Sequence, residues 1–164
     1  MNEFFASIYS WFYSNQLIET IMDEFTEDGT IILSSDFLPL GITTAVISFL
    51  IAVAFYIWPI NHPRFKAWWA WLIMLVTNAV INFGLAFAFL SYRIGVIEDN
   101  SELLEQVEDQ CGDSCVTDET LSVSFGNMLD LAFANVCASV MFFIIASLIL
   151  TWFSTSAKYS PFRN

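Results

Sequence analysis

The chain has 164 residues, of which 57% are hydrophobic, 17% aromatic and only 13% charged. A soluble domain carries roughly 25% charged residues, so this composition excludes an ordinary water-soluble globular protein. The formal net charge is −12 and Lys and Arg together number only 5, which excludes a nucleic-acid-binding surface. Because the apolar residues come in long blocks, we expect a lipid bilayer to bury most of them.

The first segment, residues 1–37, is apolar but too interrupted to cross a membrane. At 100° per residue its apolar side chains gather on one face over Phe4–Phe12 and on a rotated face over Leu17–Phe25. We therefore expect an extracytoplasmic amphipathic arm, bent or in two short helices, that lies at the outer membrane interface. Packing of this arm against the transmembrane helices or against a partner subunit is the alternative.

Three segments, residues 38–58, 67–90 and 125–153, each supply the about 20 predominantly apolar residues that a helix needs to cross the hydrocarbon core. None contains Lys or Arg, and Asp130 is their single acid. The predicted fold is therefore all-α, an integral membrane protein with three transmembrane helices. An N-terminal amphipathic interfacial helix and a small acidic extracytoplasmic loop, residues 91–124, complete it.

The basic residues predict the orientation, because Lys and Arg in short loops are retained on the cytoplasmic side. The loop 59–66 and the tail 154–164 hold four of the 5 basic residues. We expect both segments to be cytoplasmic, with the N-terminus outside. The small size and the absence of a targeting signal suggest a bacterial inner membrane. The four residues are Arg64, Lys66, Lys158 and Arg163.

No residue pattern supports catalysis, so we expect neither an enzyme nor a cofactor. The sole histidine, His62, lies between two prolines in the predicted cytoplasmic loop and has no acid nearby, which is typical of a loop residue. The carboxylates between Glu98 and Glu119 could attract calcium, but their spacing does not match an EF-hand loop. A solvated acidic surface is the simpler interpretation, and no metal site is predicted.

Two cysteines in the acidic loop, Cys111 and Cys115, flank Gly112, which lets so short a loop fold back. Oxidising conditions outside the cytoplasm favour a disulfide between them. A free or redox-active pair and a metal site are the alternatives. Cys137, inside the third apolar segment, is interpreted as a small buried residue.

Each apolar segment carries a stripe of polar or small residues at helical spacing. Asparagine amides in hydrocarbon need partners, because an unmet polar group there costs several kcal/mol. The stripes could hold the helices of one subunit together, line a pore or cavity formed by several subunits, or contact a different protein. Asp130 could be a proton or cation site, but it lies only about one turn inside the outer end, where water or headgroups reach it. The candidate residues are Thr44, Ser48, Asn78, Asn82, Asp130, Asn135 and Ser139.

The functional expectation is a non-enzymatic membrane subunit that assembles through its transmembrane helices. We expect a homo-oligomer that forms or gates a pore, because three helices of this size do not enclose a conduit alone. The alternative is an accessory or scaffold subunit of a larger envelope complex. The expected partners are the lipid bilayer and other membrane subunits, either further copies of the chain or different proteins.

Overall fold

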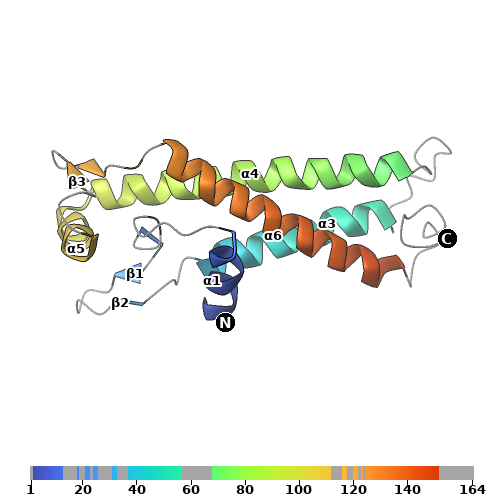
Figure 1. Ribbon diagram of the computed structural model, residues 1–164, viewed down its shortest axis with the longest axis horizontal. Helices are drawn as coiled ribbons and strands as arrows, with labels where there is room; N and C mark the ends of the chain where they lie inside the picture. The colour runs from blue at the N-terminus through green and yellow to red at the C-terminus, as the bar shows by residue number, and fades with distance from the viewer. Residues whose placement is uncertain are drawn as a thin grey trace.

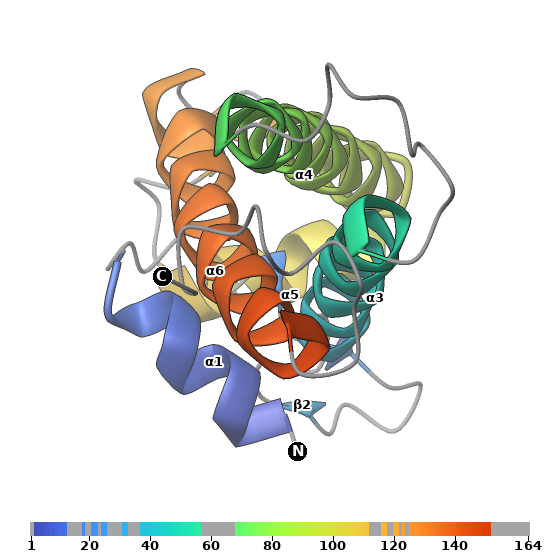
Figure 2. The same cartoon turned by 90° about the vertical axis from the view of Figure 1, so that its right-hand side faces the viewer.

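Three long helices dominate the computed structural model of the chain: α3 (Phe37–Tyr56), α4 (Trp68–Glu98) and α6 (Phe125–Thr151). They run alongside one another in Figure 1 and form a three-cornered bundle when viewed end-on in Figure 2. Each is long and apolar enough to cross a membrane. The chain is therefore nearly all helical with three long apolar helices, as predicted, and it adds two short hairpins that the sequence did not predict. The structure describes residues 2–12, 18, 21–22, 24–25, 31–32, 37–56, 68–111, 116–117, 120–121, 123 and 125–151.

The two ends of the bundle differ because α4 is longer than a membrane is thick. Its 31 residues span about 46 Å at 1.5 Å per residue, against about 30 Å for a hydrocarbon core. At one end, which we call the loop end, α3 finishes at Tyr56, α6 finishes at Thr151 and α4 begins. At the other end α4 continues past the expected limit at Leu90 and projects beyond α3 and α6 (Figure 1).

The projecting part of α4 supports a small folded unit, which we call the cap. It consists of α4 beyond Leu90, α5 (Ser101–Cys111), the hairpin of β3 (Val116–Thr117) and β4 (Thr120–Leu121), and the buried arm residues Ile18, Ile21 and Met22. The arm also forms a two-residue hairpin, β1 (Glu24–Phe25) with β2 (Ile31–Ile32).

An apolar core holds the cap together. Ile18, Ile21, Ile97 and Val107 are fully buried in one cluster although they lie far apart in the sequence. Two hydrogen bonds fasten its edges to α4, from the backbone N–H of Leu121 to a Glu98 carboxylate oxygen at 3.1 Å and from the Arg93 guanidinium to the carbonyl of Ile21 at 3.3 Å. The same apolar cluster continues into the bundle through Leu90 and Leu131, so the core of the cap is joined to the bundle.

The N-terminal helix α1 (Asn2–Ser10) packs against α3 and α6 in the half of the bundle nearer the cap (Figure 1). Phe5 and Tyr9 point inward and are buried, while Phe4 and Trp11 are exposed. Phe5 rests directly on the backbone of α3 at Gly41, where an added Cβ would collide with the aromatic ring. Gly41 is thus needed for close approach, and the arm packs against the spans over these residues.

Several predictions concern segments outside the described residues. These are the loop with His62, Arg64 and Lys66 and the tail with Lys158 and Arg163. The proposed disulfide falls there as well, because α5 ends at Cys111 and the next described residue is Val116. These predictions stand as predictions.

Candidate functional site

Except for Asp130, the predicted stripe residues meet in the centre of the bundle, where α3, α4 and α6 face one another. Each of them is 0% exposed. Together with Tyr9 of α1 they form a continuous set of hydrogen-bonding groups, which we call the polar column. Its members are Tyr9, Thr44, Ser48, Asn78, Asn82, Asn135 and Ser139.

Asn135 of α6 is the hub of the polar column. Its Oδ1 accepts hydrogen bonds from the Tyr9 hydroxyl at 2.5 Å and from the Thr44 hydroxyl at 2.8 Å. Its Nδ2 donates to the backbone carbonyl of Asn82 at 2.7 Å. One side chain thus connects α6 to α1, α3 and α4.

The second part of the polar column lies one turn farther towards the loop end, around the carbonyl of Ser139. Asn78 Nδ2 donates to that carbonyl at 3.1 Å, and Ser48 Oγ donates to it at 3.3 Å. A carbonyl oxygen has two lone pairs, so it can accept from side chains beyond its helical bond. Here α3 and α4 are both held to α6 through a backbone atom.

Asn82 and Asn78 fix each other's amide orientation. Asn82 Nδ2 donates to the Asn78 carbonyl at 2.9 Å and to Asn78 Oδ1 at 3.0 Å. Turning the Asn82 amide around would place its oxygen against both acceptors, so the orientation is determined. Asn82 Oδ1 is consequently a buried acceptor to which the described residues bring no donor.

A second, smaller polar cluster lies at the loop end. Trp71 Nε1 donates to Ser147 Oγ at 3.4 Å, and Thr151 Oγ1 lies 2.6 Å from the Ser147 carbonyl and 3.4 Å from the Tyr56 hydroxyl. Between this cluster and the polar column lies the fully buried ring of Phe143, with its centroid 5.7 Å from that of Trp71. An aromatic layer therefore separates the two sets of polar groups.

Sequence reasoning did not single out the loop-end cluster or Tyr9. Ser139, Ser147 and Thr151 recur at spacings that place them on one face of α6, and this signal could have extended the stripe. Tyr9 gave no such signal, because an interfacial tyrosine and a tyrosine that reaches into the bundle look alike in sequence.

The buried hydroxyl of Tyr9 stays protonated. Burial raises the pKa of Tyr9 well above its ordinary value, and the hydrogen bond with Thr44 offsets this rise only in part. A neutral hydroxyl can donate, which the bond to Asn135 Oδ1 requires. Tyr9 therefore acts as a fixed donor that joins α1 to the bundle.

Two α6 residues singled out from the sequence, Asp130 and Cys137, point away from the bundle. Asp130 is exposed near the cap-side end of the helix, where it makes no contact with the polar column. Cys137 is also exposed, so its interpretation as a buried residue is wrong: the face of α6 that carries it is turned outward, and α3 and α4 cover the opposite face.

Nothing in the described part of the chain resembles a metal centre, since no group of three or more His, Cys, Asp or Glu side chains comes together there. No family model, curated protein or solved structure matches this chain. Its function has to be argued from the geometry of the bundle and the cap.

Proposed function

We propose that the protein is a non-enzymatic membrane subunit in which the three-helix bundle anchors and positions the cap for contact with a partner in a larger envelope complex. The observation that carries this proposal is that the groups of the polar column form hydrogen bonds with one another. Its amides and hydroxyls bind one another within a single chain, and they are fully buried.

The outward face of the bundle supports an anchoring role. The large side chains exposed there are apolar on all three helices, among them Phe49 on α3, Val80 on α4 and Ile145 on α6. The exposed hydroxyls of Thr43 and Ser91 bond back to carbonyls of their own helices. A surface of this kind suits lipid or another helix rather than an aqueous path.

The cap supports a contact role through its charge. Glu98, Asp99, Glu105 and Glu108 are all exposed on an element that the apolar core holds in place. A basic surface on the partner would complement them. By the positive-inside rule the cap and α1 face away from the cytoplasm, and α3 and α6 end on the cytoplasmic side.

A homo-oligomer that forms or gates a pore is the second candidate. The unmet acceptor Asn82 Oδ1 favours it, because a water molecule reaching the polar column would satisfy this atom. In such an oligomer the three helices would have to separate enough to expose the column, and the Phe143 layer would have to open.

Reconstitution separates these two functions. The purified protein in liposomes should give no ion flux above protein-free liposomes, and native mass spectrometry should show a monomer or small species. A symmetric oligomer together with flux would instead establish the pore.

A double variant locates the source of any flux. Asn78→Leu with Asn82→Leu should lower the free energy of unfolding by about 0.6 kcal/mol, the average for one interhelical bond in membranes, because only the bond from Asn78 to the Ser139 carbonyl joins two helices. The double variant should also leave flux at background. The matched control is Val76→Leu with Val80→Leu on the outward face of the same helix. Flux that the first pair abolishes and the second preserves would contradict the anchoring proposal.

A further inference from the structure

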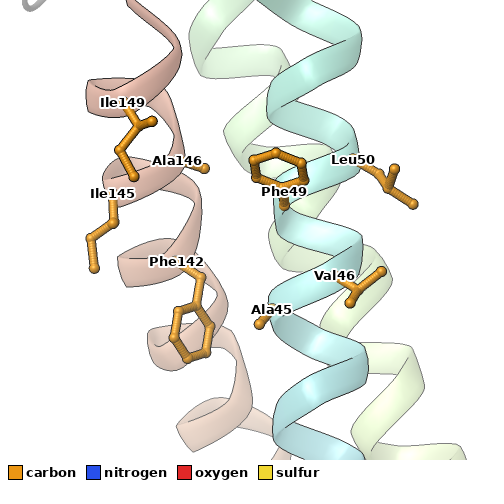
Figure 3. A pocket seen from close by; sticks show the side chains of 8 residues that line it. All are labelled: Ala45, Val46, Phe49, Leu50, Phe142, Ile145, Ala146 and Ile149. Atoms are coloured by element: carbon orange, nitrogen blue, oxygen red, sulfur yellow. The ribbon is translucent and has the colours of Figure 1, made fainter.

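An apolar groove runs between α3 and α6 on the outside of the bundle, towards the loop end (Figure 3). Its volume is about 350 Å³. Ala45 and Ala146 point into the gap between the two helices (Figure 3), and larger side chains rise on both sides. These are Phe49 on α3 and Phe142, Ile145 and Ile149 on α6.

The groove lies along the line where α3 and α6 meet, which we call the α3–α6 seam. Helix α1 covers another part of the same seam. Phe5 of α1 lies over Gly41 of α3 and against Phe142 of α6, with ring centroids 6.4 Å apart. Phe142 in turn lines the groove. The cap-side half of the α3–α6 seam is therefore filled by the Phe5 ring. The loop-side half, which contains the groove, begins beyond the part that α1 covers.

The chemistry of the groove walls limits which kind of molecule can bind there. Every lining side chain is hydrocarbon. The polar side chains of the neighbouring turns, Thr44 and Ser48 on α3 and Ser139 on α6, are buried in the polar column. Helices associate in membranes through close backbone contact between small residues or through hydrogen bonds. Here Phe49, Ile145 and Ile149 are about half exposed and stand up from the helices, so a second helix would be kept away from Ala45 and Ala146.

The size of the groove suits a flexible hydrocarbon chain. A methylene group takes roughly as much room as a water molecule, about 30 Å³ in the liquid, so the groove holds on the order of ten methylenes. A helix is about 10–12 Å across with its side chains and would lie over the rims without entering.

We propose that the loop-side half of the α3–α6 groove binds one acyl chain of a phospholipid. Because α1 closes the cap-side end at Phe5 and Phe142, the chain enters from the leaflet at which α3 and α6 end. The bound lipid fills the seam that α1 leaves uncovered, so α1 and the lipid together cover the full length of the α3–α6 contact.

Photo-crosslinking tests this site directly. The full-length protein is reconstituted in dioleoylphosphatidylcholine vesicles with a small fraction of a phosphatidylcholine that carries a diazirine within one acyl chain. After illumination, labelled residues are mapped by peptide mass spectrometry. We expect several-fold more label per residue on the groove walls than on Ile73, Val76 and Val80, which face outward on α4.

Two variants fill the groove from opposite walls, Ala45→Leu on α3 and Ala146→Leu on α6, and Val80→Leu on α4 is the matched control. Each groove variant should reduce labelling of the groove to the level of α4, and the control should not. Equal labelling of the groove and α4 in the unaltered protein overturns the proposal, whether or not the variants fold. Absence of label from the groove overturns it as well, because a second polypeptide in the seam would keep the lipid out.

Discussion

The bundle and the cap have opposite distributions of polar and apolar side chains, although α4 runs through both. In the bundle the polar side chains are inside, with Asn82 and Asn135 fully buried, and apolar side chains such as Val80 face outward. In the cap the apolar residues Ile97 and Val107 are inside and the acids Glu105 and Glu108 face outward. Lipid around the bundle and water around the cap would produce this contrast, because apolar side chains gain from leaving water but not from leaving lipid.

We expect the largest effect from a charge placed in the cap core, where apolar side chains are buried. Val107→Asp puts an unpaired carboxylate at a fully buried position, and we expect a loss of about 3 kcal/mol, within the range for burying an unpartnered polar group. Hydrogen exchange should speed up across α5 and the end of α4 while the membrane part of the bundle stays protected. The exposed substitution Glu108→Gln is the control. Loss of protection throughout the bundle would show that the cap and bundle are one cooperative unit.

The corresponding change in the bundle removes the hub of the polar column. Asn135→Leu deletes one donor and one acceptor and leaves the hydroxyls of Tyr9 and Thr44 without their shared acceptor. We expect the free energy of unfolding in detergent to fall by about 2 kcal/mol, from three bonds at about 0.6 kcal/mol each. Cys137→Leu, on the exposed side of the same helix, should change it little. Equal effects of the two substitutions would mean that the column does not hold the helices together.

Substitutions at Gly41 and Gly84 test how much the close contact between α1 and α3 contributes to stability. Gly41→Ala should displace Phe5 and loosen α1, at a cost of about 1 kcal/mol, the lower end for overpacking. Gly84 on α4 has open space around it, so Gly84→Ala should be neutral or stabilising by up to about 1 kcal/mol, as expected for an interior helix position. Proteolysis of the N-terminal arm and thermal unfolding measure the two effects. A destabilised Gly84→Ala protein would indicate a helix partner on the outward face of α4.

The smallest effect at neutral pH concerns Tyr9. Because its folded-state pKa lies above the unfolded value of about 10, its contribution to stability is complete below about pH 10 and is lost as pH rises through the folded-state pKa. Tyr9→Phe should cost only about 0.6 kcal/mol at pH 7 and should flatten the decline in stability above about pH 10. Unfolding curves of both proteins between pH 7 and 11 provide the comparison. An unchanged alkaline decline in the variant would show that Tyr9 is not responsible for it.

Hydropathy alone was sufficient to predict the three apolar helices, because an apolar run of about 20 residues is typical of a helix that can cross a membrane. Helical spacing also indicated which polar residues share a face, such as Asn78 with Asn82. It could not show whether that face meets the same chain or another copy, since both satisfy an amide equally well. The structure places these residues against α6, at Ser139 and Asn135.

The cap and the position of α1 were beyond sequence reasoning for a different reason. Tyr9 finds its partner Asn135 126 residues away, and the cap core combines Ile18, Ile97 and Val107 from three separate segments. Such contacts depend on the whole fold. The continuation of α4 beyond Leu90 was missed because hydropathy falls there although the helix does not end.

The central claim is that the polar column joins helices of one chain, and cysteine crosslinking tests it most directly. Ser48 and Ser139 face each other across α3 and α6, with Ser48 Oγ 3.3 Å from the Ser139 carbonyl. In a background with Cys111, Cys115 and Cys137 replaced by Ala, the pair Ser48→Cys and Ser139→Cys is oxidised in native membranes, and the product is analysed on a denaturing gel and by peptide mass spectrometry. We predict a crosslink within a single chain and a band at monomer mass. A ladder of crosslinked dimers and higher species, with no intrachain product, would contradict the account.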